Sequence, residues 1–332
     1  MEAKKMSRAT LVLRGGWVLP LVAGTAFLFA ANDPPDPQPS RINKAIELLA
    51  QEQPIYYFTE GRGGSQGGFK EGLRLAQTWA DLIIYEMEFG PYDVTELREF
   101  MAGLVQGGPT SSGHRTPAVQ VVVPFSGYDA ATVRSNHWVV QQILAAGVHG
   151  ITLCHARDPA AVREFVRAAR FPHHRQGVDE GPLDEGLRGN GGQANAAQIW
   201  GLSPQEYMRR ADVWPLNPEG EILIGLKIED KYALAAAEDS ASVPGVGYAE
   251  WGPGDMGLSL GYPEIHDPPY PRIVEQARQR VFKATQEAGI AFLDVVTLEN
   301  VEERLREGTR IGATRSREAA EAGRRFTKRP QP

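Results

Sequence analysis

The sequence predicts an α/β protein built as a TIM-like (β/α)8 barrel, and three observations lead to this fold class. Eight short apolar runs alternate along the chain with segments of helical periodicity. The runs are apolar on both faces, which is typical of parallel strands covered by helices. The Gly-rich stretch 61–68 lacks the Gly-x-Gly-x-x-Gly spacing that the competing architecture, an open doubly wound sheet, usually carries. We interpret that stretch as an active-site loop or turn, with phosphate binding as the alternative.

The predicted strands are short and rich in Val, Ile, Leu and Tyr. They are 55–58, 82–87, 118–123, 150–153, 222–228, 246–251, 290–296 and 310–313. The predicted helices place apolar residues three and four positions apart, as Ile42, Ile46 and Leu49 do in the first of them. These helices are 42–51, 68–80, 94–105, 129–146, 159–170, 231–241, 271–288 and 298–307.

The chain divides into four segments by composition. Residues 1–31 begin with basic residues and continue as an apolar run, which predicts a signal peptide, or alternatively an uncleaved membrane anchor. Residues 32–41 are a Pro-rich linker, and 42–320 form the barrel. The barrel contains a Gly- and Asn-rich insertion, 171–220, which indicates a lid or a subunit contact. Residues 321–332 are a charged tail. Either form of the N-terminal segment implies export, to the periplasm or beyond the cell.

The overall composition is that of a globular protein with a large core. The 332 residues carry a net charge of -6 and are 42% hydrophobic. No basic cluster is present, which argues against a nucleic-acid partner. The single cysteine, Cys154, lies in an apolar run, so no internal disulfide forms, and we interpret its thiol as a packed core group.

Two carboxylates follow strand-like runs and indicate a metal site. Glu229 ends the run that begins at Ile222, and Asp255 follows the run that begins at Val246. Active sites of such barrels form where strands end and loops begin. Two carboxylates there, with few histidines nearby, offer hard oxygen ligands for Mg²⁺ or Mn²⁺. The alternative is that both residues only cap helices.

Several motifs resemble those of the HpcH/HpaI aldolase/citrate lyase family, whose members are metal-dependent class II aldolases acting on 2-oxo acids. The motifs are 85–91, 114–120, 146–151, 227–229 and 252–262. The last reads Gly-Pro-x-Asp-x-x-x-Ser-x-Gly-Tyr, and Glu229 precedes Asp255 by 26 residues. The resemblance spans about 42–313, nearly all of the mature chain, and implies a barrel that assembles as a homo-oligomer with exchanged C-terminal helices.

The resemblance also implies a chemistry. Glu229 and Asp255 would hold the metal, and a 2-oxo acid would chelate it, with an aldehyde as a further partner of the reaction. The metal would stabilise an enolate, and the backbone N–H groups of Gly254 and Asp255 would bind the substrate carboxylate.

Five positions depart from the family pattern. The family histidine after the second strand is Phe89, and the Asp that precedes it is Glu86. The Asp that pairs with that histidine is Ala145, the Arg at the end of the third strand is Gln120, and the Gln two residues before the metal Glu is Lys227. The acid–base pair is therefore absent.

Other groups are candidates for the lost roles. Lys227, Glu86 and His155 are candidate acid–base groups, and Gln120 is a candidate catalytic and substrate-binding residue. Phe89 suits a bulkier or less polar substrate. The alternative for Lys227 is an ion pair with Glu229 or Glu86 in an inactive site.

Three functions follow from these residues. The first is a divalent-metal-dependent carbon–carbon lyase of the aldolase type acting on 2-oxo acids. The second is a relative that binds an oxo acid without turning it over. The third is a different enzyme on the same scaffold, such as a hydrolase or a lyase for a larger substrate.

Overall fold

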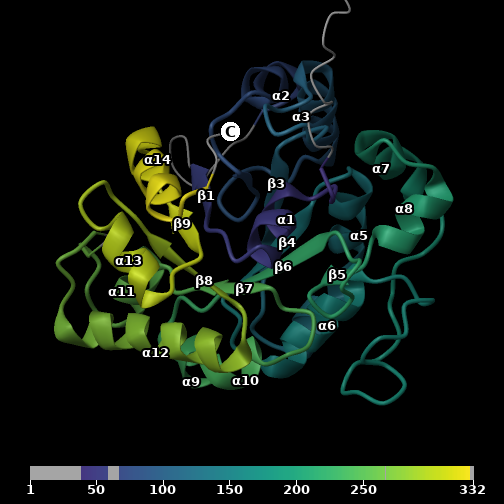
Figure 1. Ribbon diagram of the computed structural model, residues 1–332. Coiled ribbons are helices and arrows are strands. Elements are labelled where there is room, and N and C mark those ends of the chain that lie inside the picture. The colour runs from purple at the N-terminus through teal and green to yellow at the C-terminus, as the bar shows by residue number, and fades with distance from the viewer. Residues whose placement is uncertain (1–38, 59–66, 266, 330–332) are drawn as a thin grey trace, which may run out of the picture. The chain divides into compact units, whose positions relative to one another are not determined.

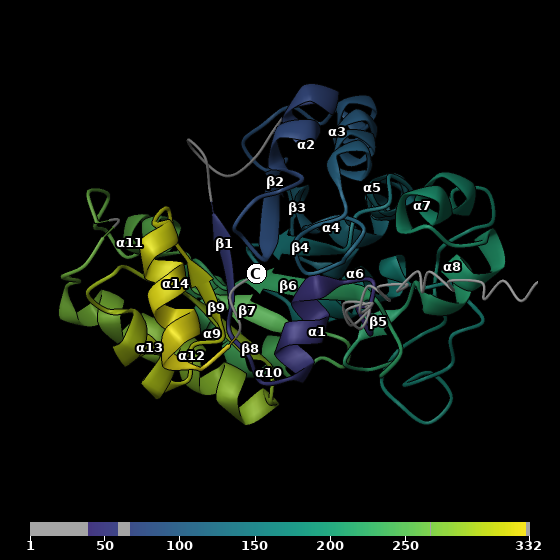
Figure 2. The same ribbon diagram turned by 45° about the horizontal axis from the view of Figure 1, so that its top comes forward.

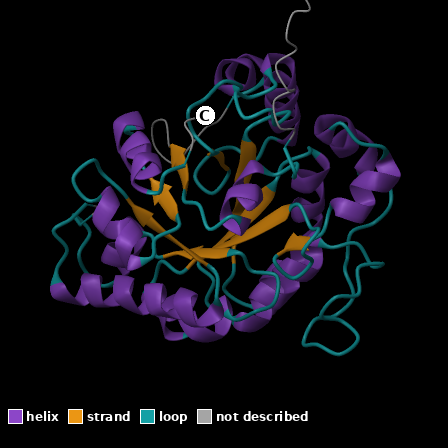
Figure 3. Cartoon of the chain, in the orientation of Figure 1, coloured by secondary structure: helices purple, strands orange, loops and turns teal. Residues whose placement is uncertain are grey.

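The computed structural model describes residues 39–58, 67–265 and 267–329, and in this part of the chain the strands form a closed parallel barrel (Figures 1 and 3). Hydrogen-bonded neighbours run β4-β3-β2-β1-β9-β8-β7-β6, and pairing of β4 with β6 closes the ring of eight. A further strand of two residues, β5, is not part of the ring and pairs in parallel with β6. The strands are β1 Ile55–Phe58, β2 Leu82–Glu86, β3 Ala118–Ser126, β4 Gly150–Cys154, β5 Val213–Trp214, β6 Ile222–Lys227, β7 Tyr248–Glu250, β8 Ala291–Val295 and β9 Ile311–Ala313. The predicted fold class is confirmed.

Helices surround the barrel: most cover its outside between successive strands, and the one before β1 packs Ala45 and Ile46 with residues of the barrel interior (Figures 1 and 2). They are α1 Lys44–Ala50, α2 Phe69–Leu75, α3 Val94–Gly107, α4 Ala130–Ser135, α5 His137–Ala145, α6 Pro159–Ala169, α7 Gln193–Trp200, α8 Pro204–Arg210, α9 Lys231–Ala235, α10 Ala237–Ala241, α11 Pro253–Ser259, α12 Arg272–Ala288, α13 Val301–Glu307 and α14 Arg317–Phe326. The helix predicted over 129–146 is two helices, because the chain leaves helical geometry at Asn136 (φ -107°, ψ 11°). There the Asn136 amide donates to Thr132 O at 2.9 Å, an alternative to continuing the helix.

The strand residues alternate between two buried layers. Ile55 and Tyr57 of β1 and Ile84 of β2 face the barrel interior, which also holds Cys154. Tyr56, between the first two, packs outward with residues of α13 and α14. Both sides of each strand are therefore apolar, as a barrel inside a ring of helices requires. Burial raises the pKa of the Cys154 thiol well above its ordinary value, which suits a packed thiol rather than a nucleophile.

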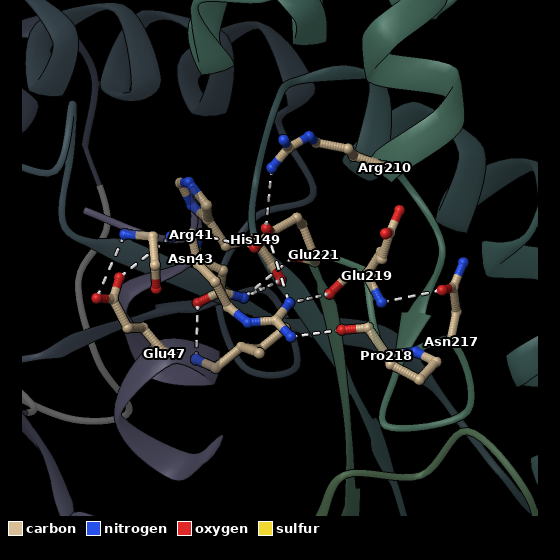
Figure 4. A network of polar contacts seen from close by, with 12 residues as sticks. Arg41, Asn43, Glu47, His149, Arg210, Asn217, Pro218, Glu219 and Glu221 are labelled. Carbon is tan, nitrogen blue, oxygen red and sulfur yellow. Dashed lines mark hydrogen bonds and ion pairs between the residues drawn. The ribbon is translucent and has the colours of Figure 1, made fainter. Parts of the chain in front are cut away.

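Residues before α1 are fixed to the barrel by a buried polar network (Figure 4). The Asn43 side chain donates to His149 O at 3.0 Å and to Glu221 O at 3.1 Å. It also accepts from the N–H groups of Ala45 and Ile46, and so caps α1. The Asn43 N–H donates to Glu221 Oε2, whose carboxylate also pairs with Arg41. The start of the barrel domain is thus held by hydrogen bonds as well as by apolar packing.

The C-terminal segment is part of the barrel rather than a tail. The boundary predicted at 320 falls inside α14. Arg324 and Arg329 are buried and, with Lys44, surround the buried carboxylate of Asp81 at 2.8–3.2 Å. Burial alone would raise the pKa of Asp81, but these three cations lower it to about 2. The sequence of 321–332 shows its charge, but it does not show that Arg324 and Arg329 share the buried Asp81 as a partner.

Three sequence predictions concern segments on which the structure bears little. The signal peptide or anchor over 1–31, most of the linker over 32–41 and most of the Gly-rich stretch 61–68 lie outside the described residues. Among the helices that the structure does describe, none is both long enough and apolar enough to span a bilayer. The insertion 171–220 contains α7, α8 and β5.

Candidate active site

The site lies where several strands end together. Glu86, Lys227 and Glu250 are the last residues of β2, β6 and β7, and Lys227 is paired in register with Glu250. Because parallel strands bring their carboxyl ends to one side of a barrel, these charged side chains meet the loops that follow them. Glu88 and Glu229 come two residues after the ends of β2 and β6. One ammonium and four carboxylates are therefore collected at this end of the barrel.

Lys227 is at the centre of these charges. Its Nζ lies 2.6 Å from Glu88 Oε2, 3.0 Å from Glu229 Oε2 and 4.0 Å from Glu250 Oε1. Burial alone would lower the pKa of Lys227, but the surrounding carboxylates outweigh it and raise that pKa well above its ordinary value. These contacts favour the charged form of the lysine, and its role as an acid–base group stays a prediction. The Phe89 ring, 73% exposed, lies above it with its centroid 5.7 Å from Nζ.

The carboxylates exceed the cations that face them. Burial raises the pKa of Glu229 to about 7, and Lys227 offsets this only in part because Glu88 and Asp255 add negative charge. Burial and neighbouring carboxylates raise the pKa of Glu250 to about 8. Burial also raises the pKa of Glu86, to about 7. Shifts in this direction reflect burial of the carboxylates that the nearby cation does not fully offset.

A second pair of residues flanks this cluster. His155 directly follows β4, and its Nδ1 lies 2.8 Å from Oδ2 of Asp230, which directly follows Glu229. This hydrogen bond raises the pKa of His155. The same carboxylate oxygen accepts from Arg157 Nε at 2.9 Å, and the other caps α9. His155 has φ +46°, an unusual conformation for this residue type, which its hydrogen bonds hold in place.

The residues fit a divalent cation. Glu88, His155 and Glu229 each place one ligand atom so that all three lie within 4.8 Å of one another. Oε2 of Glu229 is buried and accepts no hydrogen bond from the described residues, although Lys227 faces it. Gly252, with φ +47°, brings the next loop so near that a Cβ there would lie 2.7 Å from this oxygen. The excess carboxylate charge and the oxygen ligands suit Mg²⁺ or Mn²⁺.

Asp255, the second predicted metal ligand, lies in the first turn of α11 and is partly exposed. Its charge reaches Glu229, but it is not one of the three residues whose ligand atoms lie together. Gly254 is its neighbour in the same turn. The strand that precedes it ends at Glu250, so the carboxylate that this strand delivers directly is Glu250. The roles of Gly254 and Asp255 stay predictions.

Gln120 is not at the end of its strand, and the prediction that placed it there is wrong. It is the third of the nine residues of β3 and is fully buried in the barrel interior. Its Nε2 donates to Thr152 Oγ1 at 3.1 Å and to Leu223 O at 3.3 Å. Thr152 in turn bonds the Tyr248 hydroxyl at 2.7 Å. Gln120 joins strands below the site, because β3 continues to Ser126 beyond the predicted end.

The positions of the missing acid–base pair are far apart in the fold. Phe89 follows the carboxyl end of β2, whereas Ala145 ends α5, ahead of the amino end of β4. They lie toward opposite ends of the barrel, because α5 runs antiparallel to the strands. Within one chain, therefore, the neighbour that could replace such a pair is His155 with Asp230.

Sequence reasoning did not assign roles to three residues of the site. Glu250 could have been found by the rule that identified Glu229, since it ends an apolar run. Glu88 lies within the motif 85–91, but its contact with Lys227 joins positions 139 residues apart. Asp230 adjoins Glu229, and nothing in the sequence indicates that it meets His155, 75 residues away.

Comparison with known proteins places the sequence in a family. The family model of HpcH/HpaI aldolase/citrate lyase matches residues 113–316. A 2-keto-3-deoxy-L-rhamnonate aldolase of Klebsiella pneumoniae is 26% identical over 230 residues, 68% of this chain and 79% of that protein.

Solved structures share the fold. An HpcH/HpaI aldolase/citrate lyase family protein from Burkholderia cenocepacia J2315 superposes with a TM-score of 0.63 at 23% identity, covering 86% of this chain and 98% of that one. An HpcH/HpaI aldolase from Desulfitobacterium hafniense DCB-2 gives 0.59 at 19% identity, with 84% and 92% covered. The chain belongs to the HpcH/HpaI aldolase/citrate lyase family, a family of aldolases and lyases.

Proposed function

We propose that this protein is a divalent-metal-dependent carbon–carbon lyase of the aldolase type that acts on a 2-oxo acid. The observation that carries the proposal is the excess of buried carboxylate around Glu229, whose Oε2 accepts no hydrogen bond from the described residues. A dication would relieve that excess and is what the family's chemistry uses. The named relative that acts on a 2-keto acid supports the same substrate class.

Glu229 would hold the metal, with Asp255 as the second ligand implied by the family and Glu88 as a further donor nearby. When bound, the cation would orient the keto and carboxylate oxygens of the substrate and withdraw electron density while the carbon–carbon bond breaks. Gly254 and Asp255 would offer backbone N–H groups to the substrate carboxylate. Phe89, which is largely exposed and lies above Lys227, would contact the substrate from the side of that lysine.

His155 is the group that we propose to carry the proton. Asp230 accepts from its Nδ1 and so fixes the ring, leaving Nε2 on the side of Glu88, 3.8 Å from Oε1. Lys227 holds Glu88 and Glu229 in place and adds positive charge near the substrate oxygens. Glu86 accepts from the Glu88 N–H at 2.6 Å and so shapes the turn that carries Glu88.

Exchange of the pyruvate methyl protons with D₂O tests the proposal, since a lyase of this type must be able to remove or add a proton at that carbon. Proton NMR should show loss of the methyl signal with wild-type protein and Mg²⁺ or Mn²⁺. Glu229→Gln keeps the shape of the side chain and should abolish the exchange. No exchange by the wild-type protein with either metal would overturn the proposal of catalysis.

The second candidate function is binding of an oxo acid without turnover. It is favoured by the contacts of Lys227, whose ammonium lies between Glu88 and Glu229, where it competes with a metal for both. This function predicts that pyruvate raises the melting temperature while the methyl protons stay unexchanged. The two measurements together distinguish the candidates.

Two further properties are proposals from the sequence and the family. Export through residues 1–31 predicts that the protein isolated from its native cells is found outside the cytoplasm and lacks its first ~30 residues, which N-terminal sequencing and fractionation measure. If the protein is a homo-oligomer, light scattering should give a mass that is a multiple of the mass of the mature chain. That mass is 36.3 kDa minus the mass of the removed segment.

A further inference from the structure

A cavity of about 320 Å³ is lined by residues of α5 and of the segment that leads into α7. The helices α5 and α7 lie beside each other on the outside of the barrel (Figure 2). Its volume is within the range of small-molecule sites. It contains two arginines and no aspartate or glutamate. Its lining residues are Arg98, Trp138, Gln141, Gln142, Ala145, Phe171, Arg188, Gly189, Asn190, Gly191, Gly192 and Gln193.

Arg188 is a buried cation that has no anionic partner among the residues that the structure describes. Only 4% of the residue is exposed, and its guanidinium stacks on the Phe171 ring at 4.2 Å. Its Nη2 donates to the Tyr207 hydroxyl at 2.8 Å. Within residues 39–58, 67–265 and 267–329, no hydrogen bond is made by its buried Nη1 and no carboxylate is within ion-pair distance. Guanidinium stays charged at all physiological pH values, so its burial is costly unless an anion compensates it.

The first turn of α7 offers donors at the same place. Gly192 precedes α7 and has no side chain that could cap this helix. No other side chain in the described part of the chain caps it either. The Gln193 side chain turns back to accept from the Gly191 N–H at 2.7 Å. The first N–H groups of a helix lack intrahelical partners and carry the positive end of its dipole. Helix starts of this kind bind anions.

We propose that this cavity is a binding site for a small oxyanion, a carboxylate or a phosphate group, held by Arg188 and the first turn of α7. Nη1 of Arg188 would donate to one oxygen of such a group, while its Nη2 keeps the Tyr207 hydroxyl. Backbone N–H groups of α7 would bind it from another side, and Arg98, exposed at the cavity, adds positive charge. The site is distinct from the carboxylate cluster at the strand ends, and it does not depend on the proposed reaction.

The neighbouring glycine gives a matched pair of variants. Gly189 is exposed in the cavity wall, and a Cβ there would meet no atom within 4 Å. Gly189→Asp and Gly189→Asn therefore both fit, and they differ only in charge. Aspartate would place a carboxylate next to Arg188 and compete with an incoming anion, whereas asparagine would not.

Isothermal titration calorimetry of the full chain with inorganic phosphate, and separately with succinate, at constant ionic strength tests the proposal. Wild type and Gly189→Asn should bind at least one of the two anions saturably, with dissociation constants within about threefold of each other. Gly189→Asp should bind that anion at least tenfold more weakly, as should Arg188→Met. The anion that binds more tightly identifies a phosphate or a carboxylate site.

Absence of saturable binding of both anions, or equal binding by the Asp and Asn variants, would overturn the proposal. If Arg188→Met does not fold, the Gly189 pair still decides, since neither change buries a charge. Metal-dependent exchange of pyruvate protons should be the same in both Gly189 variants, so failure of this site and failure of the proposed reaction are measured separately.

Discussion

Nδ1 of His155 lies 2.8 Å from Oδ2 of Asp230, although the two residues follow different strands and are 75 positions apart. The resemblance predicts that Phe89 and Ala145 occupy the positions of the family's acid–base pair, and we propose that this contact takes over its role. Asp230 also caps α9 through its other oxygen, with bonds of 2.8 and 2.9 Å to Tyr232 N and Ala233 N. A single carboxylate thus fixes both a helix and the histidine.

Asp230→Asn should slow the exchange of pyruvate protons about tenfold or more while the melting temperature changes little. An Asn side chain still caps the helix, but it loses the charge that orients and stabilises the protonated ring. Asp230→Ala should lose both exchange and about 1 kcal/mol of stability. His155→Asn is the matched change at the histidine, since Asn tolerates positive φ. Unchanged exchange in Asp230→Asn would contradict the role of this pair.

Lys227→Met should reduce the free energy of unfolding by about 3 kcal/mol in the absence of metal, because Glu88, Glu229 and Glu250 lose their shared cation. Mg²⁺ should restore more of the stability of this variant than of wild type, since the ammonium no longer competes for the same oxygens. Chemical denaturation with and without Mg²⁺ measures both. Equal stabilisation of the two proteins by Mg²⁺ would show that lysine and metal do not share this site.

Stability should fall as the pH falls from about 6.5, in part because of His149. This ring is buried, stacks on Trp200 and accepts from the Val119 N–H at 3.2 Å. Burial lowers its pKa from 6.5 to about 3, so between these pH values His149 is neutral in the folded chain and protonated in the unfolded chain. The contribution is complete above pH 6.5 and decreases by at most about 1.4 kcal/mol for each pH unit below it. His149→Asn should flatten this part of a stability–pH curve, and an unchanged slope would contradict the assignment.

Arg329→Ala should cost about 2 kcal/mol of stability, because it removes two charge-assisted hydrogen bonds of 2.8 Å from the buried Asp81. Arg325→Ala, four residues earlier and exposed, is the matched control and should change stability by less than about 0.5 kcal/mol. Urea denaturation compares the two. Equal effects would show that the C-terminal arginine is not an anchor.

The eight strands of the barrel could be predicted from the sequence because each is a short run that is apolar on both faces. Such a run depends only on local composition, so β1 was predicted at its observed bounds, 55–58. Glu229 was placed at the site by the same rule. Contacts across the barrel could not be predicted in this way, since Lys227 with Glu88 and His155 with Asp230 depend on which strand ends lie side by side.

Gln120 shows why the length of a strand matters as much as its existence. The predicted strand stopped at 123, but β3 continues to Ser126, and its Pro124 does not end it. Gln120, the third of its nine residues, is buried in the barrel interior, where its Nε2 donates to Thr152 of the neighbouring strand. The buried positions of Arg324 and Arg329 were missed for a related reason, because charge alone does not indicate whether an arginine has a buried partner.

Binding of Mn²⁺, measured as the loss of the free-ion signal in electron paramagnetic resonance, tests the metal site most directly. The wild-type protein should bind about one Mn²⁺ per chain, and Mg²⁺ should displace it. Glu229→Gln should weaken binding at least tenfold, whereas Glu71→Gln, a change in a partly exposed carboxylate of α2 that pairs with Arg74, should leave it unaltered. Equal binding by wild type and Glu229→Gln, or no binding by either, would contradict the account.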